Sequence, residues 1–266
     1  MLQNAISNNP FSTIGRWVIF GIQETGRIAL FLTSGFLNIF SRPANISRIF
    51  EQIYFIGAKS VLVICLTGAF TGMVLGLQGY YVLVKYGSSG SLGAAVTISL
   101  IREMGPVLTA IMITARAGSA MSAEIGIMRI SEQIDALKTM GINPLRFLFS
   151  PRLAAGLISF PILTSIFDVV GILGGFLTGS LLLGVSPGIY FSKVESSVVM
   201  SDINGGFIKS IAFAIVVITI SCYQGYYTHR QNDFGAKGVG LSTTSAVVRS
   251  CVLILIVDYV LTSILL

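Results

Sequence analysis

The sequence predicts an all-α polytopic membrane protein, with an N-terminal interfacial amphipathic helix followed by five transmembrane helices. Hydrophobic residues make up 53% of the 266 residues, charged residues make up only 11%, and the mean hydropathy is +0.84. Soluble globular proteins carry roughly 25% charged residues, so this chain has too few to cover a water-exposed surface. The composition therefore excludes intrinsic disorder and a nucleic-acid-binding module, and it argues strongly against an independent soluble enzyme.

Residues 1–48 form a separate N-terminal region. The start of the chain lacks the basic segment of a signal peptide, so we expect no cleavage. From residue 11 to residue 40, apolar residues alternate with Arg16, Gln23, Glu24 and Arg27. This pattern favours an amphipathic helix in the cytoplasmic headgroup layer. A sixth, weakly hydrophobic span is the alternative for this region.

Five stretches in the remainder of the chain, residues 49–266, are apolar enough to cross a bilayer. A spanning helix needs about 20 mostly apolar residues. The third apolar stretch continues past a glycine- and proline-rich segment, residues 184–188. A single helix of that whole length would be about twice as long as the bilayer core is thick. We therefore end the third span at this segment. The predicted spans are residues 60–84, 92–115, 153–184, 210–228 and 241–266.

Basic residues indicate how the spans are oriented. With a cytoplasmic N-terminus, ten Lys and Arg residues lie on the inside and three on the outside, a clear positive-inside bias. The C-terminus is then on the outside of the membrane. The inside residues are Arg16, Arg27, Arg42, Arg48, Arg129, Lys138, Arg146, Arg152, Arg230 and Lys237, and the outside residues are Lys85, Lys193 and Lys209.

Small residues recur at helical spacing in two of the spans. Gly68, Gly72 and Gly76 form two overlapping GxxxG steps in the first span, and residues 171, 175 and 179 repeat the pattern in the third. Such stripes let helix backbones approach closely. They predict tight packing, either within the chain or across a dimer.

A polar segment between the second and third spans, residues 124–140, is also predicted to be a helix. Its apolar residues recur at spacings of three and four, which gives one apolar face; they are Ile127, Ile130, Ile134 and Leu137. Glycine and proline follow the segment and end it. The opposite face is either free for a soluble partner or simply solvated. The residue spacing alone does not distinguish these two possibilities.

The sequence contains few residues that could form a metal-binding or nucleotide-binding site. His229 is the only histidine, and the three cysteines lie in apolar runs without metal-ligand spacing, so a histidine-bearing metal site is nearly excluded. No GxxxxGK[ST] phosphate loop is present; the nearest approach, residues 205–210, lacks the second glycine. Any ATP hydrolysis must come from another chain.

Several ordered motifs make the chain resemble the MlaE family of permeases, which serve lipid-transporting ABC systems. The resemblance runs from about residue 50 to the C-terminus. The motifs are GMVLGLQGY at residues 72–80, REMGPV at 102–107, ARAGSA at 115–120, AEIG at 123–126, Met128, EQ at 132–133, NPL at 143–145 and SPR at 150–152.

The resemblance implies the permease subunit of an ABC transporter that moves glycerophospholipids between the inner membrane and a periplasmic carrier route, supporting outer-membrane asymmetry. It implies a homodimer in a bacterial inner membrane, with a cytoplasmic MlaF-like ATPase that binds ATP and Mg²⁺, a STAS-domain MlaB-like protein and a periplasmic MCE-domain MlaD-like ring. The segment at 124–140 would be the coupling helix, with its contacts made by Glu124, Met128, Arg129, Glu132, Gln133 and Lys138.

A lipid site needs an apolar wall and a polar rim for the headgroup. Charged groups at membrane depth are costly unless they pair or line a wet cavity, so Arg102 and Glu103 are candidates for function, with a purely structural ion pair as the alternative. The full set of candidate lipid-binding residues is Leu75, Leu77, Gln78, Tyr80, Arg102, Glu103 and Lys209. Asp168, Arg249 and Asp258 also lie in spans, and the sequence does not choose their partners.

Two other functions remain open from the residues alone. An ion-coupled secondary transporter of a small solute often shows inverted repeats with matching helix breaks, and the break near residues 184–188 has no counterpart in the first half. A non-transporting membrane scaffold would tolerate neutral replacement of Arg102 and Glu103, whereas a permease would lose lipid transport.

Overall fold

A computed structural model of the chain describes residues 10–39, 46–228 and 235–265, and every regular element within these ranges is a helix. The predicted all-α architecture with five spanning stretches is confirmed. Arg42, His229 and Arg230 lie outside the described residues. The stretches long and apolar enough to span a membrane are Ile46–Lys85, Ser89–Ile130, Pro144–Leu182, Met200–Tyr226 and Ala236–Leu265.

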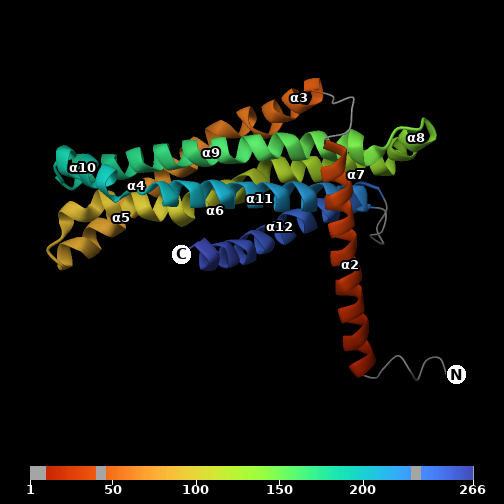
Figure 1. The fold of residues 1–266 in the computed structure, drawn as a ribbon, viewed down its shortest axis with the longest axis horizontal. Helices are drawn as coiled ribbons and strands as arrows, with labels where there is room; N and C mark the ends of the chain where they lie inside the picture. Colours follow the sequence, from red (N-terminus) through yellow and green to blue (C-terminus); the bar gives the residue numbers. More distant parts are fainter. Residues whose placement is uncertain (1–9, 40–45, 229–234, 266) are drawn as a thin grey trace.

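The first described helix, α2 (Pro10–Ile39), lies crosswise at one end of a long bundle formed by the other helices (Figure 1). Its C-terminal half docks on the bundle: Phe31 is buried, with its ring centroid 4.7 Å from that of Phe149 and 5.7 Å from that of Tyr223. Ser150 Oγ donates to the Gly35 carbonyl at 2.9 Å. Helix α2 is not among the helices apolar enough to span a membrane, and its interfacial position stays a prediction.

The first spanning stretch is bent near its start. Helix α3 (Ile46–Ile56) is followed by Gly57, a short turn η2 (Ala58–Ser60) and helix α4 (Val61–Lys85). Arg116 stabilises the bend from the second stretch, because its Nη1 donates to the Phe55 carbonyl and to Ser60 Oγ. The sequence-based boundary after residue 48 falls inside α3, so the structure has no break at that point.

The second stretch is one rod interrupted by two π-helical turns. After the short turn η3 (Ser89–Ser91) it runs through α5 (Leu92–Ser99), η4 (Leu100–Met104), α6 (Gly105–Ile113), η5 (Thr114–Gly118) and α7 (Ser119–Ile130). It therefore extends 15 residues beyond the predicted end at residue 115. The polar residues of α7 were assigned to a separate helix in the sequence, but they continue the span.

The predicted helix at residues 124–140 is divided. Helix α7 ends at Ile130, and a separate helix α8 (Gln133–Thr139) follows a turn in which Glu132 adopts a left-handed conformation with φ +58°. Non-glycine residues rarely adopt this conformation, so periodicity could not reveal the break. The predicted apolar face is split as a result, with Ile134 and Leu137 buried but Ile127 57% exposed.

The remaining chain completes the bundle. A π-helical turn η6 (Leu145–Phe149) leads into α9 (Ser150–Phe176) and η7 (Leu177–Leu182). Helix α10 (Pro187–Ser197), absent from the sequence-based assignment, is anchored by buried Tyr190, whose hydroxyl donates to the Ile172 carbonyl at 3.0 Å. The last two helices are α11 (Met200–Tyr226) and α12 (Ala236–Leu265). Helix α12 ends partway along the bundle, short of α5 and α10 (Figure 1).

The two glycine stripes pack against each other within the chain. A Cβ on Gly72 would overlap the Gly171 carbonyl, and a Cβ on Gly76 would lie 3.0 Å from the Gly175 carbonyl oxygen. Gly68 meets the Phe167 backbone in the same way. We call this α4–α9 contact the glycine seam. It shows that both stripes serve intramolecular packing, the alternative to a dimer contact that the sequence left open.

Candidate functional site

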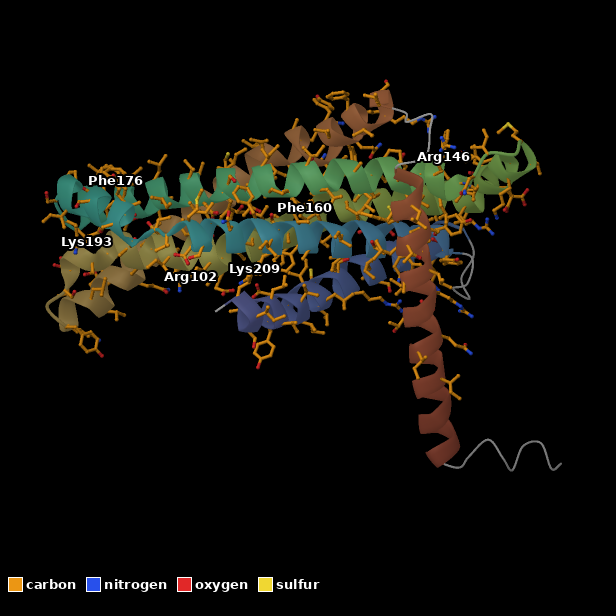
Figure 2. All side chains as sticks on the ribbon, in the orientation of Figure 1. Arg102, Arg146, Phe160, Phe176, Lys193 and Lys209 are labelled. Carbon is orange, nitrogen blue, oxygen red and sulfur yellow. The ribbon has the colours of Figure 1, made fainter. Side chains whose placement is uncertain are left out.

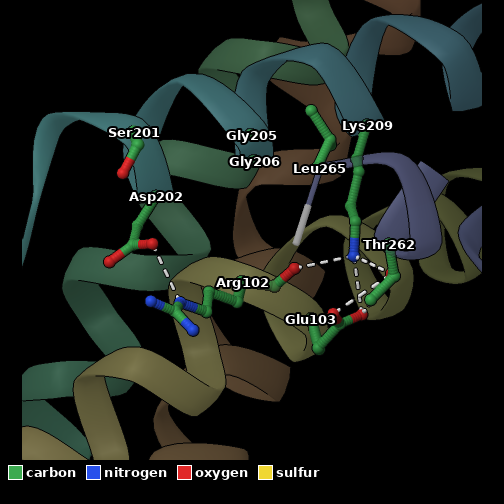
Figure 3. Close-up of a pocket in the computed structure, with 9 residues that line it drawn as sticks. All are labelled: Arg102, Glu103, Ser201, Asp202, Gly205, Gly206, Lys209, Thr262 and Leu265. Carbon is green, nitrogen blue, oxygen red and sulfur yellow. Dashed lines mark hydrogen bonds and ion pairs between the residues drawn. The ribbon is translucent and has the colours of Figure 1, made fainter.

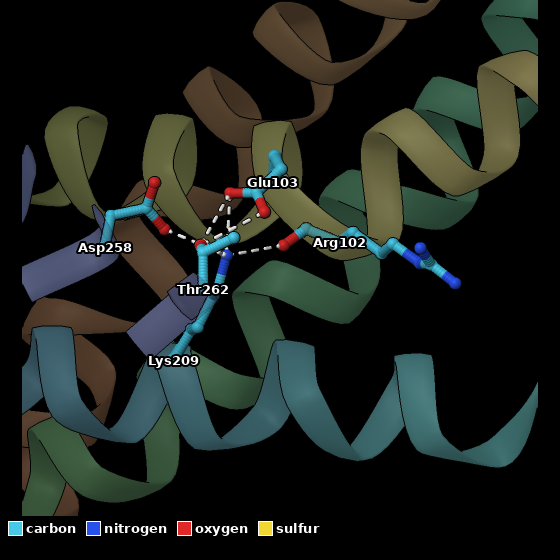
Figure 4. Close-up of polar contacts among 5 residues, drawn as sticks. All are labelled: Arg102, Glu103, Lys209, Asp258 and Thr262. Carbon is cyan, nitrogen blue, oxygen red and sulfur yellow. Dashed lines mark hydrogen bonds and ion pairs between the residues drawn. The ribbon is translucent and has the colours of Figure 1, made fainter. Parts of the chain in front are cut away.

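Charged side chains from three helices converge on Lys209, a lysine of α11 that is only 3% exposed (Figure 4). The sequence-based assignment placed this residue at the outer mouth of its span. Because α11 begins at Met200, Lys209 instead lies more than two turns inside the helix. Figure 2 shows it partway along the bundle, well away from Lys193.

Lys209 binds groups from both neighbouring segments. Its Nζ donates to Glu103 Oε2 at 2.7 Å and to the Arg102 carbonyl at 2.9 Å, both in η4. In α12 it contacts Thr262 Oγ1 at 2.6 Å and the Asp258 carboxylate at 3.0 Å. An ammonium group has three donors, so Lys209 has none left for a further ligand.

Arg102, the neighbour of Glu103, points away from it towards the first turn of α11. Its Nε donates to Asp202 Oδ1 at 2.9 Å, while 42% of its side chain stays exposed. The two adjacent charges of η4 therefore pair with α11 and α12 and not with each other. We call Arg102, Glu103, Asp202, Lys209, Asp258 and Thr262 the Lys209 cluster.

Neighbouring residues of a helix do not face each other, so Arg102 and Glu103 can serve different helices. Arg102 and Glu103 both lie in η4, where a wider turn replaces the regular helix, and such turns occur often at functional sites. Gly206 of α11 lets the two backbones approach, because a Cβ there would lie 2.9 Å from the Ile101 carbonyl oxygen. Helix packing and polar contacts thus coincide at η4.

A cavity of about 50 Å³ lies beside the cluster and is open to the surface (Figure 3). Arg102, Glu103 and Lys209 line it together with Asp202 and Thr262, and Gly205, Gly206, Ser201 and Leu265 complete the wall. The charged residues comprise two cations and three carboxylates once Asp258 is included. Within this group, the Arg102 guanidinium retains the largest exposed cationic surface.

The other four predicted lipid-binding residues lie elsewhere. Leu75 and Gln78 line a separate cavity of about 290 Å³ between α4 and α5. Leu77 is 41% exposed on α4 and Tyr80 packs edge-on against Tyr81, with ring centroids 6.1 Å apart. The structure thus brings Arg102, Glu103 and Lys209 together and separates them from this second group.

The predicted coupling residues also divide into two groups. Glu124 and Met128 lie on α7 beside α9, where Glu124 Oε2 is 2.9 Å from Arg152 Nη2. Arg129 Nη1 and Lys138 Nζ each lie 2.9 Å from Asp135 Oδ1, which joins α7 to α8. Glu132 and Gln133 are exposed at the connection between these helices.

The Asp135 carboxylate is the group that draws Arg129 and Lys138 together. Its hydrogen bond from Lys138, and then that from Arg129, lower its pKa below the ordinary value. Asp135 therefore stays charged at neutral pH and fixes α8 against α7 from the exposed side.

Two of the three remaining intramembrane charges, Arg249 and Asp258, have partners that the sequence did not indicate. Arg249 Nη1 lies 3.5 Å from Glu24 Oε1 of α2, and not near Asp168. Asp258 belongs to the Lys209 cluster. Asp168 packs against the backbone of Gly105, and its buried Oδ1 has no hydrogen-bond partner among the described residues.

Three cluster residues were missing from the predicted site. Asp202 precedes Lys209 by seven residues, and Asp258 precedes Thr262 by four, spacings that place each pair on one helix face. These spacings were readable in the sequence. Asp202 was overlooked because the span was started at residue 210, and Thr262 because a lone threonine in an apolar helix carries no charge.

Comparison with known proteins places these features in a family. The family model described as Permease MlaE matches residues 49–264. The intermembrane phospholipid transport system permease protein MlaE of Haemophilus influenzae is 39% identical over 97% of both chains. A probable ABC transporter permease protein of Rickettsia typhi is 38% identical over 97% of this chain and 98% of its own.

A plant relative is matched over a smaller share of its own length. The chloroplastic protein TRIGALACTOSYLDIACYLGLYCEROL 1 of Arabidopsis thaliana is 38% identical over 80% of this chain and 60% of its own length. The match of the family model covers η4, α11 and nearly all of α12, and so includes the whole Lys209 cluster. This multi-pass membrane protein therefore belongs to the MlaE permease family.

Proposed function

We propose that the chain is the membrane subunit of an ABC transporter that moves glycerophospholipids between the bacterial inner membrane and a periplasmic carrier route, and so supports outer-membrane lipid asymmetry. Membership in the MlaE permease family and the similarity to a permease of an intermembrane phospholipid transport system support this function. The structural observation that carries it is the Lys209 cluster, in which a buried lysine and the partly exposed Arg102 and Glu103 lie between spanning helices beside an open cavity.

Arg102 is the residue that meets the lipid headgroup. Lys209 is among the predicted lipid-binding residues, but its donors are all occupied by Glu103, Thr262 and the Arg102 carbonyl. The Arg102 guanidinium uses only Nε for Asp202, and a guanidinium binds phosphate with paired donors. Glu103 and Lys209 then act as a movable contact between η4, α11 and α12, whose partners exchange as the helices separate.

The energy comes from a separate MlaF-like ATPase that binds ATP and Mg²⁺. Its contact is the exposed end of the second rod, where Glu132 lies in the turn between α7 and α8 and Gln133 begins α8. The Arg129–Asp135–Lys138 contacts hold α8 in place. Because α7 and η4 belong to one continuous rod, motion at α8 reaches the Lys209 cluster directly.

The assembly is a homodimer in the bacterial inner membrane, with a cytoplasmic N-terminus and a periplasmic C-terminus. An MlaB-like STAS-domain protein binds the ATPase and an MlaD-like MCE-domain ring covers the periplasmic side. The crosswise helix α2 and helix α8 occupy one end of the bundle, which is the cytoplasmic end in this arrangement (Figure 1). The basic residues Arg48, Arg146 and Arg152 lie at the same end, as the positive-inside rule requires.

Reconstitution of the complete complex with a fluorescent phospholipid tests the function. We expect ATP-dependent transfer of lipid to a periplasmic acceptor by the wild type and a loss of at least about tenfold in Glu103→Ala, because Lys209 then lacks its shortest ionic contact. Assembly with the ATPase should be unchanged. Lys193→Gln, an exposed charge change in α10, is the control.

Three outcomes separate the candidate functions. Transfer that needs ATP and fails in Glu103→Ala supports the permease. Transport of a small solute driven by an ion gradient, without ATP, would instead identify a secondary transporter. A complex that assembles fully and moves no lipid in the wild type would identify a scaffold.

A further inference from the structure

A second polar cavity lies at the opposite end of the bundle from α10, between α3, α7 and the start of α9. Its volume is about 190 Å³, and it opens at the surface. Its lining is predominantly polar and contains Arg48, Glu51, Gln52, Glu124 and Arg152. It shares no residue with the cavity beside the Lys209 cluster. Nothing in the proposed transport mechanism accounts for it.

The inner wall of this cavity has hydrogen-bonding capacity that the protein does not use. Arg152 is only 4% exposed, with Nη1 donating to the Leu148 carbonyl at 2.7 Å and Nη2 lying 2.9 Å from Glu124 Oε2. Its buried Nε has no partner among the described residues, and neither has the buried Oε1 of Gln52. A buried donor and a buried acceptor left unpaired are costly, so both point to a polar ligand.

The outer wall presents one cation and one anion that are not paired with protein groups in the described part of the chain. The Arg48 guanidinium is stacked on the Phe147 ring, 3.4 Å from its centroid, and has no acidic partner among the described residues. Glu51 is exposed, one turn further along α3, and has no cationic partner there. The glutamate Glu124 is already neutralised by Arg152. The cavity thus offers opposite charges to a ligand that carries both.

We propose that this cavity binds the zwitterionic headgroup of a phospholipid, with the phosphate at Arg48 and Arg152 Nε and the ammonium group at Glu51 and Gln52 Oε1. The balanced charge disfavours a purely anionic headgroup. A water needs about 10–15 Å³ of such a cavity, and drug-sized ligands occupy roughly 300–1,000 Å³. A volume of about 190 Å³ accommodates a headgroup and leaves the acyl chains outside.

The surroundings of α3 identify a lipid and not a soluble phosphate compound as the occupant. Ile46, Phe50 and Tyr54 recur every four residues and are 62%, 65% and 61% exposed. Such a stripe is apolar and aromatic, as is typical of segments at the membrane interface. Helix α3 also continues into the first spanning stretch. The cavity therefore opens at headgroup depth, where lipid is the abundant phosphate compound.

Native mass spectrometry of the purified full chain tests the proposal. The protein is supplied with equal amounts of an ethanolamine phospholipid and a glycerol phospholipid, and the retained lipids are counted. We expect preferential retention of the ethanolamine lipid. Glu51→Gln should reduce this preference about tenfold, because only the contact to the ammonium group is lost. Since Glu51 is exposed and forms no ion pair with the described residues, this variant keeps the fold intact.

Variants at other positions separate this site from other lipid contacts. Arg48→Gln should weaken retention of both lipids, because it removes the phosphate contact. Glu195→Gln and Lys193→Gln, changes of the same kind in α10, should change neither. The inference does not require phospholipid to be the transported substrate, so Glu103→Ala should lose transport but keep this retention.

Two results would overturn the proposal. One is equal retention of the two lipids by the wild type and by Glu51→Gln. The other is complete displacement of the ethanolamine lipid by soluble phosphoethanolamine or inorganic phosphate at equal concentration, which would identify a soluble phosphate compound as the occupant.

Discussion

The glycine seam and the Lys209 cluster both hold spanning helices together, but they do so by opposite means. In the seam, backbones touch because no Cβ intervenes, as at Gly72 and Gly171. In the cluster, polar side chains make the contact, and Lys209 bridges Glu103, Asp258 and Thr262. Backbone packing permits one arrangement only. Ionic contacts can exchange partners, so we expect the helices around the cluster, and not those of the seam, to move if the chain changes conformation.

The seam should be the more sensitive of the two regions to a single substitution. Gly72→Leu places a side chain where the Gly171 carbonyl lies. Side-chain overpacking alone costs about 1–3 kcal/mol, and overlap with a backbone exceeds that range, so we expect loss of folded protein. The yield of monodisperse protein in size-exclusion chromatography measures it.

The matched control for the seam is Gly240→Leu in α12, because a Cβ on Gly240 would meet no atom within 4 Å. It should retain normal yield and thermal stability. A normal yield of Gly72→Leu would show that α4 and α9 can separate, and the distinction between a rigid seam and a movable cluster would fail.

Within the cluster, Lys209→Met should have the largest effect. It leaves the Glu103 and Asp258 carboxylates without their cation, and removal of one partner from a buried ion pair costs about 3–5 kcal/mol. Glu103 is 40% exposed at its side chain, so we expect the lower end, about 3 kcal/mol. Thermal unfolding in detergent measures it, with Lys193→Met as the control.

A double variant sharpens this prediction. Lys209→Met combined with Glu103→Gln removes one of the two unpaired carboxylates and should recover part of the lost stability. If the double variant is as unstable as Lys209→Met alone, the loss comes from packing and not from charge.

The Arg102–Asp202 pair should matter little for stability and much for transport. The Arg102 side chain is 42% exposed, and exposed ion pairs contribute about 0–1 kcal/mol. Arg102→Gln should therefore melt close to the wild type but lose lipid transfer in the reconstituted complex. Asp202→Asn removes the same ion pair and leaves the cation, so it should retain more transfer. Equal losses in both variants would contradict a headgroup role for Arg102.

The smallest expected effect concerns the contacts that hold α8 on α7. Hydrogen bonds from Lys138 and Arg129 lower the pKa of Asp135, so its stabilising contribution is present above the ordinary aspartate pKa of about 3.9. It is lost as the pH falls through the lowered folded-state pKa. Fluorescence anisotropy of a dye on Met140→Cys should be constant from neutral pH down to that range and then decrease.

Asp135→Asn provides the comparison for this titration. In that variant the anisotropy should be lower at neutral pH and should not change further on acidification. An identical acid transition in both proteins would show that another group controls the attachment of α8.

The sequence was most informative where a pattern depends only on the nearest neighbours along the chain. The apolar stretches predicted five spans because a bilayer demands about 20 such residues whatever their neighbours are. Local patterns failed at α11, where Asp202 and Lys209 looked like loop residues but lie inside the helix. Their charges are tolerated because η4 and α12 supply partners. These partners lie far away in the sequence, so a local pattern does not predict them.

The helix breaks and the grouping of the site residues also depend on more than local sequence patterns. Neither the turn at Glu132 nor the π-helical turn at Arg102 and Glu103 changes the apolar periodicity of the sequence. The sequence therefore predicts one continuous coupling helix. It also suggests that the two adjacent charges could pair with each other. The grouping of Leu75 and Gln78 with Arg102 was likewise unsupported by spacing, and the structure separates them.

By itself, the sequence determined that the chain crosses a membrane five times, that two glycine stripes pack tightly, and that charges such as Arg102 and Glu103 lie within the spans. Only the tertiary structure decided that the stripes pack on each other, that Lys209 is the centre of the buried charges, and that a second polar cavity lies beside Arg152. Apolar length and small-residue spacing are properties of one helix, whereas the partner of a buried charge is chosen by which helices become neighbours.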